Sequence, residues 1–253
     1  MLPLETIYQG RTLNLAHRGA REVAPENTLP AFQRAVEMGA DGFELDVQLT
    51  FDDVPILLHG IKLDDTTSGS GLPGEYTLEK IKELDAGAHF DHEFAGVKIP
   101  TLSEVFEAFP NVIYNVELKL FSTGDIGLER ATLDVIREHG MEERVIISSF
   151  NPFCLRRVRK LAPDVAIGVL TAPDVGFVLR KGLLLFGVRR EAIHPYYTEI
   201  DAAYMAWARR KNWRVNTWTV NEIDDMKRLL DLGVDAIITD RPDVLRSVMA
   251  GEV

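Results

Sequence analysis

The sequence predicts an α/β fold of the (β/α)8 barrel class. Short apolar runs rich in β-branched residues alternate with segments in which apolar residues recur every three or four positions. This alternation continues to the end of the 253-residue chain and gives eight strands. A barrel of this kind commonly takes about 250 residues as one domain, so we expect a single domain over residues 1–253.

The elements follow one another in the order that a parallel barrel needs. The expected strands lie at residues 13–17, 42–48, 112–118, 144–149, 165–170, 191–194, 213–218 and 235–239. The clearest helical segments between them lie at residues 28–39, 126–140, 201–212 and 222–233. Three of these segments close on Gly39, Gly140 and Gly233, where a left-handed residue would end the helix and lead into the next strand.

The alternation is interrupted once, after the second strand. The run VPILLHG at 54–60 has the pattern of a short hairpin return, and we expect an inserted lobe over residues 60–100. Within it, GSGLPG at 69–74 fits the glycine spacing of a dinucleotide site. No apolar strand precedes it and Pro73 interrupts the glycines, so we expect a surface loop.

Composition and charge exclude several function classes. With 28 Lys and Arg against 39 Asp and Glu, the net charge is −11, and no basic cluster is present to bind nucleic acid or an anionic membrane. The longest apolar stretch, at 176–188, carries two charges and is shorter than the roughly 20 residues of a membrane span. The single Cys154 and the absence of a leader pattern favour the reducing cytoplasm. Oligomeric state has no signal in the sequence.

Two carboxylates occupy positions that a barrel strand normally gives to Val, Ile or Leu. Glu44 and Asp46 are two residues apart in the second strand and therefore point to the same face. Two desolvated carboxylates repel each other, and a hard cation with oxygen ligands relieves that repulsion. The alternative is that both carboxylates face outwards or meet Lys and Arg side chains.

The third barrel strand repeats this anomaly with Glu117 and Lys119 on one face. An internal ion pair between them is one interpretation. The third strand lies beside the second in a barrel, so Glu117 is also placed to complete an oxygen site with Glu44 and Asp46. Three acids at adjacent strand ends favour the metal site.

Other chemically active side chains lie at strand ends. His17 and Arg18 end the first strand, at the carboxyl rim where barrel active sites form. The planar fork of Arg suits a phosphate, and His titrates near neutral pH. His59 follows the second strand and His194 lies near the end of the sixth, so both are candidates for the same rim. Trp218 ends the seventh strand, where it is either an aromatic wall for a substrate or part of the core.

The sequence resembles the glycerophosphodiester phosphodiesterase family across nearly its whole length. The segments that carry the resemblance, in family order, are AHRGA at 16–20, PENT at 25–28, GADGFELDVQLTFDDVPILLH at 39–59, LDDTT at 63–67, IPTLSEVF at 99–106, VELK at 116–119, TWTVN at 217–221 and GVDAIITDRPD at 233–243. The resemblance implies a TIM barrel that hydrolyses a small-molecule glycerophosphodiester to sn-glycerol 3-phosphate and an alcohol, with one divalent cation. It leaves open which alcohol is released and whether the cation is Mg²⁺ or Ca²⁺.

The resemblance also implies roles for individual residues. His17 and His59 would be the catalytic acid and base. The implied metal ligands are Glu44, Asp46 and Glu117. The implied substrate contacts are Arg18 and Lys119 for the phosphate, with Asn27 supporting the mouth through hydrogen bonds and Trp218 as the aromatic wall proposed above.

The sequence departs from the family pattern beside the second histidine. The family usually has Asp where this chain has Gly60, and Arg where it has Asp65. A lost carboxylate beside His59 would slow proton transfer or change the histidine pKa. Gly60 therefore motivates one alternative, a non-catalytic or weakly active phosphodiester-binding protein. A second alternative, in the same fold, is a lysophospholipase D-like enzyme whose apolar groove would involve Trp218 and Phe121.

Overall fold

The computed structural model describes residues 4–120, 122–173, 185 and 187–253. Eight parallel strands close into a barrel, because β1 pairs with both β2 and β9. The strands are β1 (Leu13–His17), β2 (Gly42–Leu49), β4 (Ile113–Leu118), β5 (Val145–Ser149), β6 (Ala166–Thr171), β7 (Ala192–Pro195), β8 (Arg214–Thr217) and β9 (Ala236–Thr239). The expected barrel and its eight strands are confirmed, and no strand boundary differs from the expected one by more than one residue.

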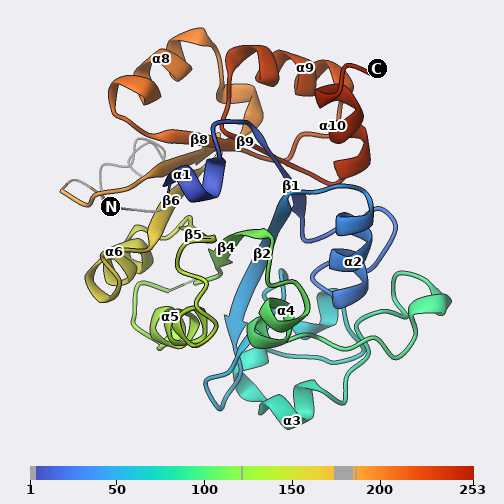
Figure 1. Cartoon of the computed structure of the whole chain (residues 1–253). Helices are drawn as coiled ribbons and strands as arrows, with labels where there is room; N and C mark the ends of the chain where they lie inside the picture. Colours follow the sequence, from blue (N-terminus) through green and yellow to red (C-terminus); the bar gives the residue numbers. More distant parts are fainter. Residues whose placement is uncertain (1–3, 121, 174–184, 186) are drawn as a thin grey trace.

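Helices surround the strands as an outer layer (Figure 1). They are α2 (Leu29–Glu37), α4 (Leu102–Ala108), α5 (Leu128–Glu138), α6 (Pro152–Leu161), α8 (Ala202–Arg210), α9 (Ile223–Leu232) and α10 (Pro242–Met249). Side-chain caps begin several of them, since Thr28, Asn151 and Asp201 accept backbone N–H groups of the first turn. Gly39, Gly140 and Gly233 have positive φ, as the sequence predicted for residues that end helices.

The segment between β2 and α4 forms the expected interruption. Strand β3 (Pro55–Leu57) returns antiparallel to β2, and short elements follow it: 3₁₀ helices η1 (Leu63–Asp65), η2 (Pro73–Glu75) and η3 (His92–Phe94), and helix α3 (Leu78–Ile81). The segment packs on its own small apolar cluster, which includes Leu58, Ile81 and Ile99. This hairpin return carries His59 back to the barrel mouth.

The amino end of the barrel is closed by a helix that the sequence analysis did not anticipate. Helix α1 (Leu4–Tyr8) lies over the strands in Figure 1, and its buried Ile7 and Tyr8 belong to the interior cluster of Leu13, Leu15 and Ile238. Burial of these apolar side chains is the main contribution that stabilises the helix on the barrel. Because this end is closed, the opposite end is where a small molecule can enter the barrel.

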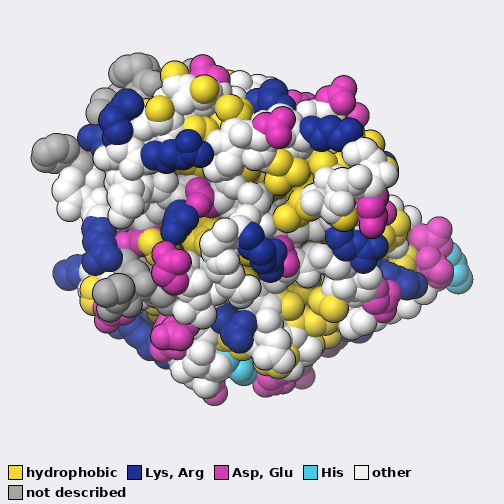
Figure 2. All heavy atoms as spheres, turned by 45° about the horizontal axis from the view of Figure 1, so that its top comes forward, with side chains coloured by type: hydrophobic (Ala, Val, Ile, Leu, Met, Phe, Trp, Pro, Cys, Tyr) yellow, Lys and Arg dark blue, Asp and Glu magenta, His cyan; other side chains and the backbone are white. Residues whose placement is uncertain are grey.

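The face of the molecule in Figure 2 carries both signs of charge. Lys and Arg side chains are dispersed among Asp and Glu there and form no continuous basic patch. None of the helices in the described part of the chain is long and apolar enough to cross a membrane. The apolar stretch at 176–188 falls largely outside the described residues.

Candidate functional site

A cavity of about 240 Å³ opens at the carboxyl ends of the strands. It is lined by His17, Arg18, Glu44, His59, Asn115, Glu117, Lys119, Phe150, Leu170, Trp218 and Ile238. Seven of the nine site residues expected from the sequence are among these, and Asp46 and Asn27 lie immediately behind them, bonded to the lining. The structure therefore brings the expected set together at one mouth.

Strand register brings the three carboxylates together. In the parallel β2–β4 pair, Asp46 lies opposite Glu117, and β1 places His17 opposite Glu44. Carboxylate oxygens of Glu44, Asp46 and Glu117 lie within 4.8 Å of one another, and all three side chains are buried. The adjacency follows from the period of two along each strand and the order of the strands.

Burial and mutual repulsion change the acidity of two of these groups. Burial, followed by the charges of Asp46 and Glu117, raises the pKa of Glu44 well above its ordinary value. Burial likewise raises the pKa of Glu117 to about 7. Such shifts show that concentrated negative charge is unfavourable here without a counter-charge.

Two basic side chains supply part of that counter-charge. Lys119 Nζ lies 3.1 Å from Asp46 Oδ1 and 2.9 Å from Glu117 Oε1, and Arg18 Nε lies 3.0 Å from Asp46 Oδ2. Although burial opposes it, Lys119 and Arg18 hold the pKa of Asp46 below its usual range. The ion pair that the sequence offered as an alternative to a metal site is therefore present within the same cluster.

The acidic cluster could hold a metal ion. Glu44 Oε2 is buried and has no hydrogen-bond partner among the described residues. Three carboxylates with an unpaired buried oxygen are the ligand chemistry of hard divalent cations. No other cluster of this kind occurs among the described residues, and the loop of His89, Asp91 and His92 is exposed.

His17 is held by a carboxylate that the sequence analysis did not single out. Its Nδ1 lies 2.7 Å from Asp240 Oδ1 at the end of β9, and Asn221 donates to the other oxygen of Asp240 at 2.7 Å. With Nδ1 donating to Asp240, Nε2 is the free nitrogen, and it lies 3.8 Å from Glu44 Oε2. Burial lowers the pKa of His17 although Asp240 opposes that change.

His59 is fixed through its neighbours in the chain. Gln48 Nε2 donates to the carbonyls of Leu58 at 2.8 Å and Gly60 at 2.6 Å, which flank the histidine on both sides. His59 Nδ1 lies 3.9 Å from Glu26 Oε1. The ring is partly open to solvent, and burial of the remainder lowers its pKa to about 4.

The loop after β1 is held in an unusual conformation. Arg18 and Asn27 both have positive φ, at 58° and 55°, and strain of this kind persists where the surroundings enforce it. Asn27 Nδ2 donates to Asp46 Oδ2 at 2.9 Å, which is the supporting contact expected for it. Glu26 forms an ion pair with Arg18 and a second one, at 3.0 Å, with Arg21.

The other side of the cavity is apolar. Trp218 contacts Phe150 edge to face, with centroids 5.6 Å apart, and its Nε1 donates to the carbonyl of His194 at 3.0 Å. Leu170 and Ile238 complete this side. Trp218 is thus both a cavity wall and part of the packing. Phe121, the other expected groove residue, lies outside the described residues.

His194 does not reach the rim. Its ring is fully buried in the barrel interior and fills the space left by Gly168, where a Cβ would lie 2.2 Å from Nε2. It bonds to Asn216, at 3.0 Å, and burial lowers its pKa to about 3. The absence of a side chain at Gly168, on the neighbouring β6, leaves room for the ring inside the barrel.

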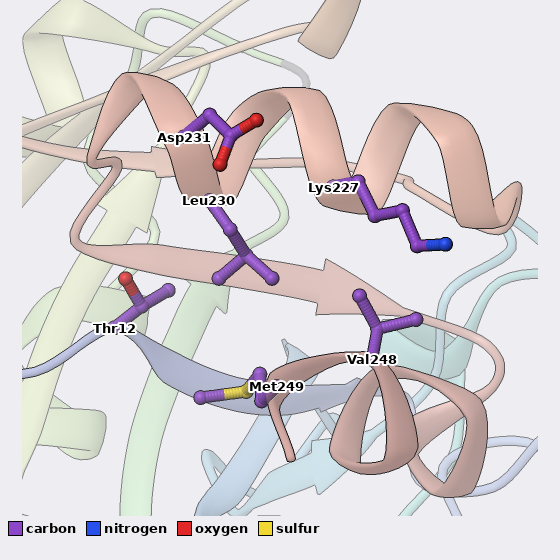
Figure 3. Close-up of a pocket in the computed structure, with 6 residues that line it drawn as sticks. All are labelled: Thr12, Lys227, Leu230, Asp231, Val248 and Met249. Carbon is purple, nitrogen blue, oxygen red and sulfur yellow. The ribbon is translucent and has the colours of Figure 1, made fainter. Parts of the chain in front are cut away.

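A larger hollow elsewhere lacks the chemistry of a site. Figure 3 shows it between α9 and α10, with Lys227 and Asp231 on one side and Val248 on the other. It has about 460 Å³ but is shallow, and it holds no group of converging titratable side chains. The mouth of the barrel remains the candidate active site.

Comparisons with known proteins identify relatives of this chain. The chain matches the Glycerophosphoryl diester phosphodiesterase family over residues 17–244. A protein of Caldanaerobacter subterraneus subsp. tengcongensis named glycerophosphodiester phosphodiesterase is 44% identical over 239 residues, covering 93% of this chain and 96% of the relative. A Bacillus subtilis protein of the same name is 33% identical and covers 95% and 87%.

Solved structures share the fold. The crystal structure of a Silicibacter pomeroyi protein described as a glycerophosphoryl diester phosphodiesterase superposes with a TM-score of 0.87 at 26% identity, covering 99% of this chain and 98% of that one. An Oleispira antarctica phosphodiesterase in complex with the product sn-glycerol-3-phosphate superposes with a TM-score of 0.83 at 29% identity, covering 93% and 96%.

Proposed function

Because the chain belongs to the glycerophosphoryl diester phosphodiesterase family, we propose that it hydrolyses glycerophosphodiesters to sn-glycerol 3-phosphate and an alcohol with the aid of one divalent cation. The observation that carries the proposal is the convergence of two histidines, two basic side chains and two carboxylates on one cavity of about 240 Å³, with the carboxylate of Asp46 directly behind them. This set matches a reaction that must bind a phosphodiester anion and move two protons.

Arg18 and Lys119 are the proposed phosphate contacts. Both face the cavity and both neutralise Asp46 in the free protein. A phosphodiester between them would replace part of that pairing, and the same charges would stabilise negative charge on the nonbridging oxygens as the reaction proceeds. Asn27 maintains the arrangement because it fixes Asp46, to which both side chains are bonded.

Glu44, Asp46 and Glu117 are the proposed metal ligands, and Mg²⁺ or Ca²⁺ suits them. When bound, the ion would supply electrostatic stabilisation of the phosphate. Three carboxylates fit either ion, since selectivity depends on cavity size and retained water.

His17 is the proposed base and His59 the proposed acid. Asp240 keeps the proton of His17 on Nδ1, so that Nε2 is free to take the proton of the nucleophile. His59 then protonates the oxygen of the departing alcohol as the phosphorus–oxygen bond breaks. In the free protein its pKa is about 4, lowered first by burial, and the charge of a bound phosphodiester would raise it.

The nucleophile is either water or the neighbouring glycerol hydroxyl of the substrate. Attack by water forms the glycerol monoester directly. Attack by the hydroxyl forms a cyclic phosphate that water opens in a second step. Detection of the cyclic species during turnover would distinguish the two.

The local structure supports activity in spite of Gly60. The Asp65 carboxylate occupies the space that a side chain at position 60 would need, since a Cβ there would lie 2.1 Å from Asp65 Oδ2. His59 is held instead by the two bonds from Gln48 and by Glu26. We therefore favour a catalytic protein over a phosphodiester-binding one.

The test is release of sn-glycerol 3-phosphate from glycerophosphocholine by protein stripped with EDTA and then supplied with Mg²⁺, Ca²⁺ or Mn²⁺. Turnover restored by a metal supports the proposal and identifies the ion. Parallel arms use ethanolamine, glycerol and inositol diesters and a lysophospholipid. Turnover of the lysophospholipid alone would favour the lysophospholipase D-like activity suggested by the apolar wall. Tight binding without turnover under every metal would favour the binding protein.

A further inference from the structure

Asn115 is a buried side chain at the floor of the cavity, and the mechanism proposed above gives it no role. It points inwards from β4, is 1% exposed and lines the cavity. Neither Oδ1 nor Nδ2 has a hydrogen-bond partner among the described residues. The other buried asparagines in the described part of the chain, Asn14, Asn27 and Asn216, each donate through Nδ2 at 2.8 to 3.0 Å.

An amide buried in this way is unfavourable unless it meets a polar group. Packing does not require one here, because the residues that flank Asn115 in the barrel interior include Ile113 on its own strand and Ile146 opposite it on β5. An apolar side chain at position 115 would continue that interior. The amide is therefore best explained by a polar ligand that enters the cavity.

The surroundings define the polar group that would fit. Glu44 lies opposite Asn115 in the β2–β4 register, and its Oε2 is likewise unpartnered. Asn115 thus offers an N–H donor and a carbonyl acceptor at the floor, beside a carboxylate that is a proposed metal ligand. A hydroxyl both donates and accepts, so it can satisfy the amide. A quaternary ammonium or an alkyl chain cannot do so.

The position along the strand indicates which part of the substrate reaches this floor. Asn115 lies two residues below Glu117 and four below Lys119, and a strand rises about 3.3 Å per residue. The phosphate contacts Arg18 and Lys119 are therefore nearer the opening than Asn115 is. A substrate with its phosphate at these contacts can direct its glycerol part inwards, while the variable alcohol faces the exit.

We propose that Asn115 binds a hydroxyl of the glycerol moiety and determines specificity for a hydroxylated substrate at this end. This inference rests on the proposed function, which supplies the glycerophosphodiester. Asn115 selects the polyol end through a donor and an acceptor on one side chain, whereas the charged residues above it recognise only the phosphate.

The experiment compares the affinities of sn-glycerol 3-phosphate and n-propyl phosphate, which share a charged phosphate but differ in their hydroxyls. Dissociation constants are measured by calorimetry on full-length protein with divalent metal present. The wild type is expected to prefer glycerol 3-phosphate by at least about tenfold, as a pair of hydrogen bonds to one hydroxyl would give. In Asn115→Leu, a change of similar volume, the preference should fall to about onefold, with propyl phosphate affinity within about twofold of wild type.

Two further variants keep the test decisive. Ser148→Ala removes another buried, unpartnered polar atom from the next strand, but Ser148 does not line the cavity, so the preference should remain. Asn115→Ser serves as the test if the Leu variant does not fold. It keeps one hydroxyl at this position and should show an intermediate preference for glycerol 3-phosphate. A metal titration of each variant separates loss of the ion from loss of the hydroxyl contact.

An unchanged preference in both Asn115 variants would overturn the inference. Equal loss of both ligands, or loss of metal affinity, would overturn it as well, because either result assigns Asn115 to support of the metal or the fold. Turnover of glycerophosphocholine by the wild type is measured on the same sample. Its absence would count against the proposed function, while the affinity ratio would still test Asn115.

Discussion

The two sides of the barrel mouth are built from different residues. Strands β1, β2 and β4 contribute His17, Glu44, Asp46 and Glu117, whereas β5, β6, β8 and β9 lead to Phe150, Leu170, Trp218 and Ile238. The first group, with Arg18 and Lys119, forms the charged side of the mouth, and the second forms the apolar side. The charged groups are thus concentrated on strands that are neighbours in the barrel, and each carboxylate lies beside a basic group or another carboxylate. The difference suggests that the charged side performs the reaction and the apolar side shapes the space.

The largest effect is expected from removing the imidazole of His17, the proposed base on the charged side. His17→Ala should lower kcat by about 10² to 10⁴-fold, because it removes the proposed proton acceptor. Steady-state release of glycerol 3-phosphate measures the change, and circular dichroism checks the fold. His92→Ala, on the exposed η3, is the matched control and should leave kcat unchanged. Equal kcat in wild type and His17→Ala would remove His17 from the mechanism.

Asp240→Asn should lower kcat by at least about tenfold with little change in KM. The amide no longer selects the tautomer that leaves Nε2 of His17 free. The pH profile of kcat/KM is the informative measurement, since loss of the carboxylate also lowers the pKa of His17 and moves the acidic limb downwards. A variant with lower stability but an unshifted profile would show that Asp240 acts only on the fold.

A third prediction concerns metal binding without reference to activity. An ion bound to the folded state alone stabilises it by about 2.7 kcal/mol at 100 times its Kd. Thermal unfolding of EDTA-treated wild type should therefore rise in Tm when Mg²⁺ or Ca²⁺ is added. Glu44→Gln should lose most of this increase, and Glu79→Gln, on exposed α3, should keep it. An increase of the same size in Glu44→Gln would place the ion elsewhere.

Acid should destabilise the protein through His194, in the barrel interior below the apolar side, and stabilise it through Glu117 on the charged side. The pKa of His194 is about 3, lowered by burial, so the unfolded chain binds a proton below about pH 6.5 that the folded protein does not. Its contribution to the free energy of unfolding should then fall by about 1.4 kcal/mol per pH unit between about pH 6.5 and 3. The raised pKa of Glu117 acts the other way between about pH 4.5 and 7.

Urea unfolding of metal-free wild type and His194→Gln across this range isolates the histidine, because other groups cancel in the difference. The stability difference between the two proteins should change with pH in the direction that favours the variant in acid. A difference that is constant with pH would show that His194 does not remain neutral in the folded protein.

The smallest effect is expected on the apolar side. Trp218→Phe keeps an aromatic wall but loses the bond from Nε1 to the carbonyl of His194, which is worth about 1 kcal/mol. KM should rise by a few-fold, with kcat within about twofold of wild type, in assays with glycerophosphocholine. A loss of kcat as large as that of His17→Ala would end the division of roles between the two sides.

The charged side was the more predictable from sequence. Glu44, Asp46 and Glu117 break an apolar alternation on neighbouring strands, so their period and strand order were enough to place them together. Asp240 was visible only as the acid that ends the last strand, since its contact with His17 joins residues 223 positions apart. Glu26 and Gln48 act through loop contacts that periodicity does not encode.

The remaining differences also have physical causes. Helix α1 has five residues, too few to show helical periodicity. Trp218 could not be assigned from sequence because a residue that ends a strand meets both the cavity and the packing. Asn115 carries no sequence signal beyond an amide in an apolar strand, and only its lack of partners in the folded barrel identifies it.

The most direct test of the central claim is the identity of the bond that breaks. Phosphorus NMR of glycerophosphocholine, incubated with metal-loaded wild-type protein, follows the diester and its products together. The account predicts that the diester signal is replaced by that of sn-glycerol 3-phosphate, with free choline released. Formation of phosphocholine instead, or an unchanged diester under every metal, would contradict it.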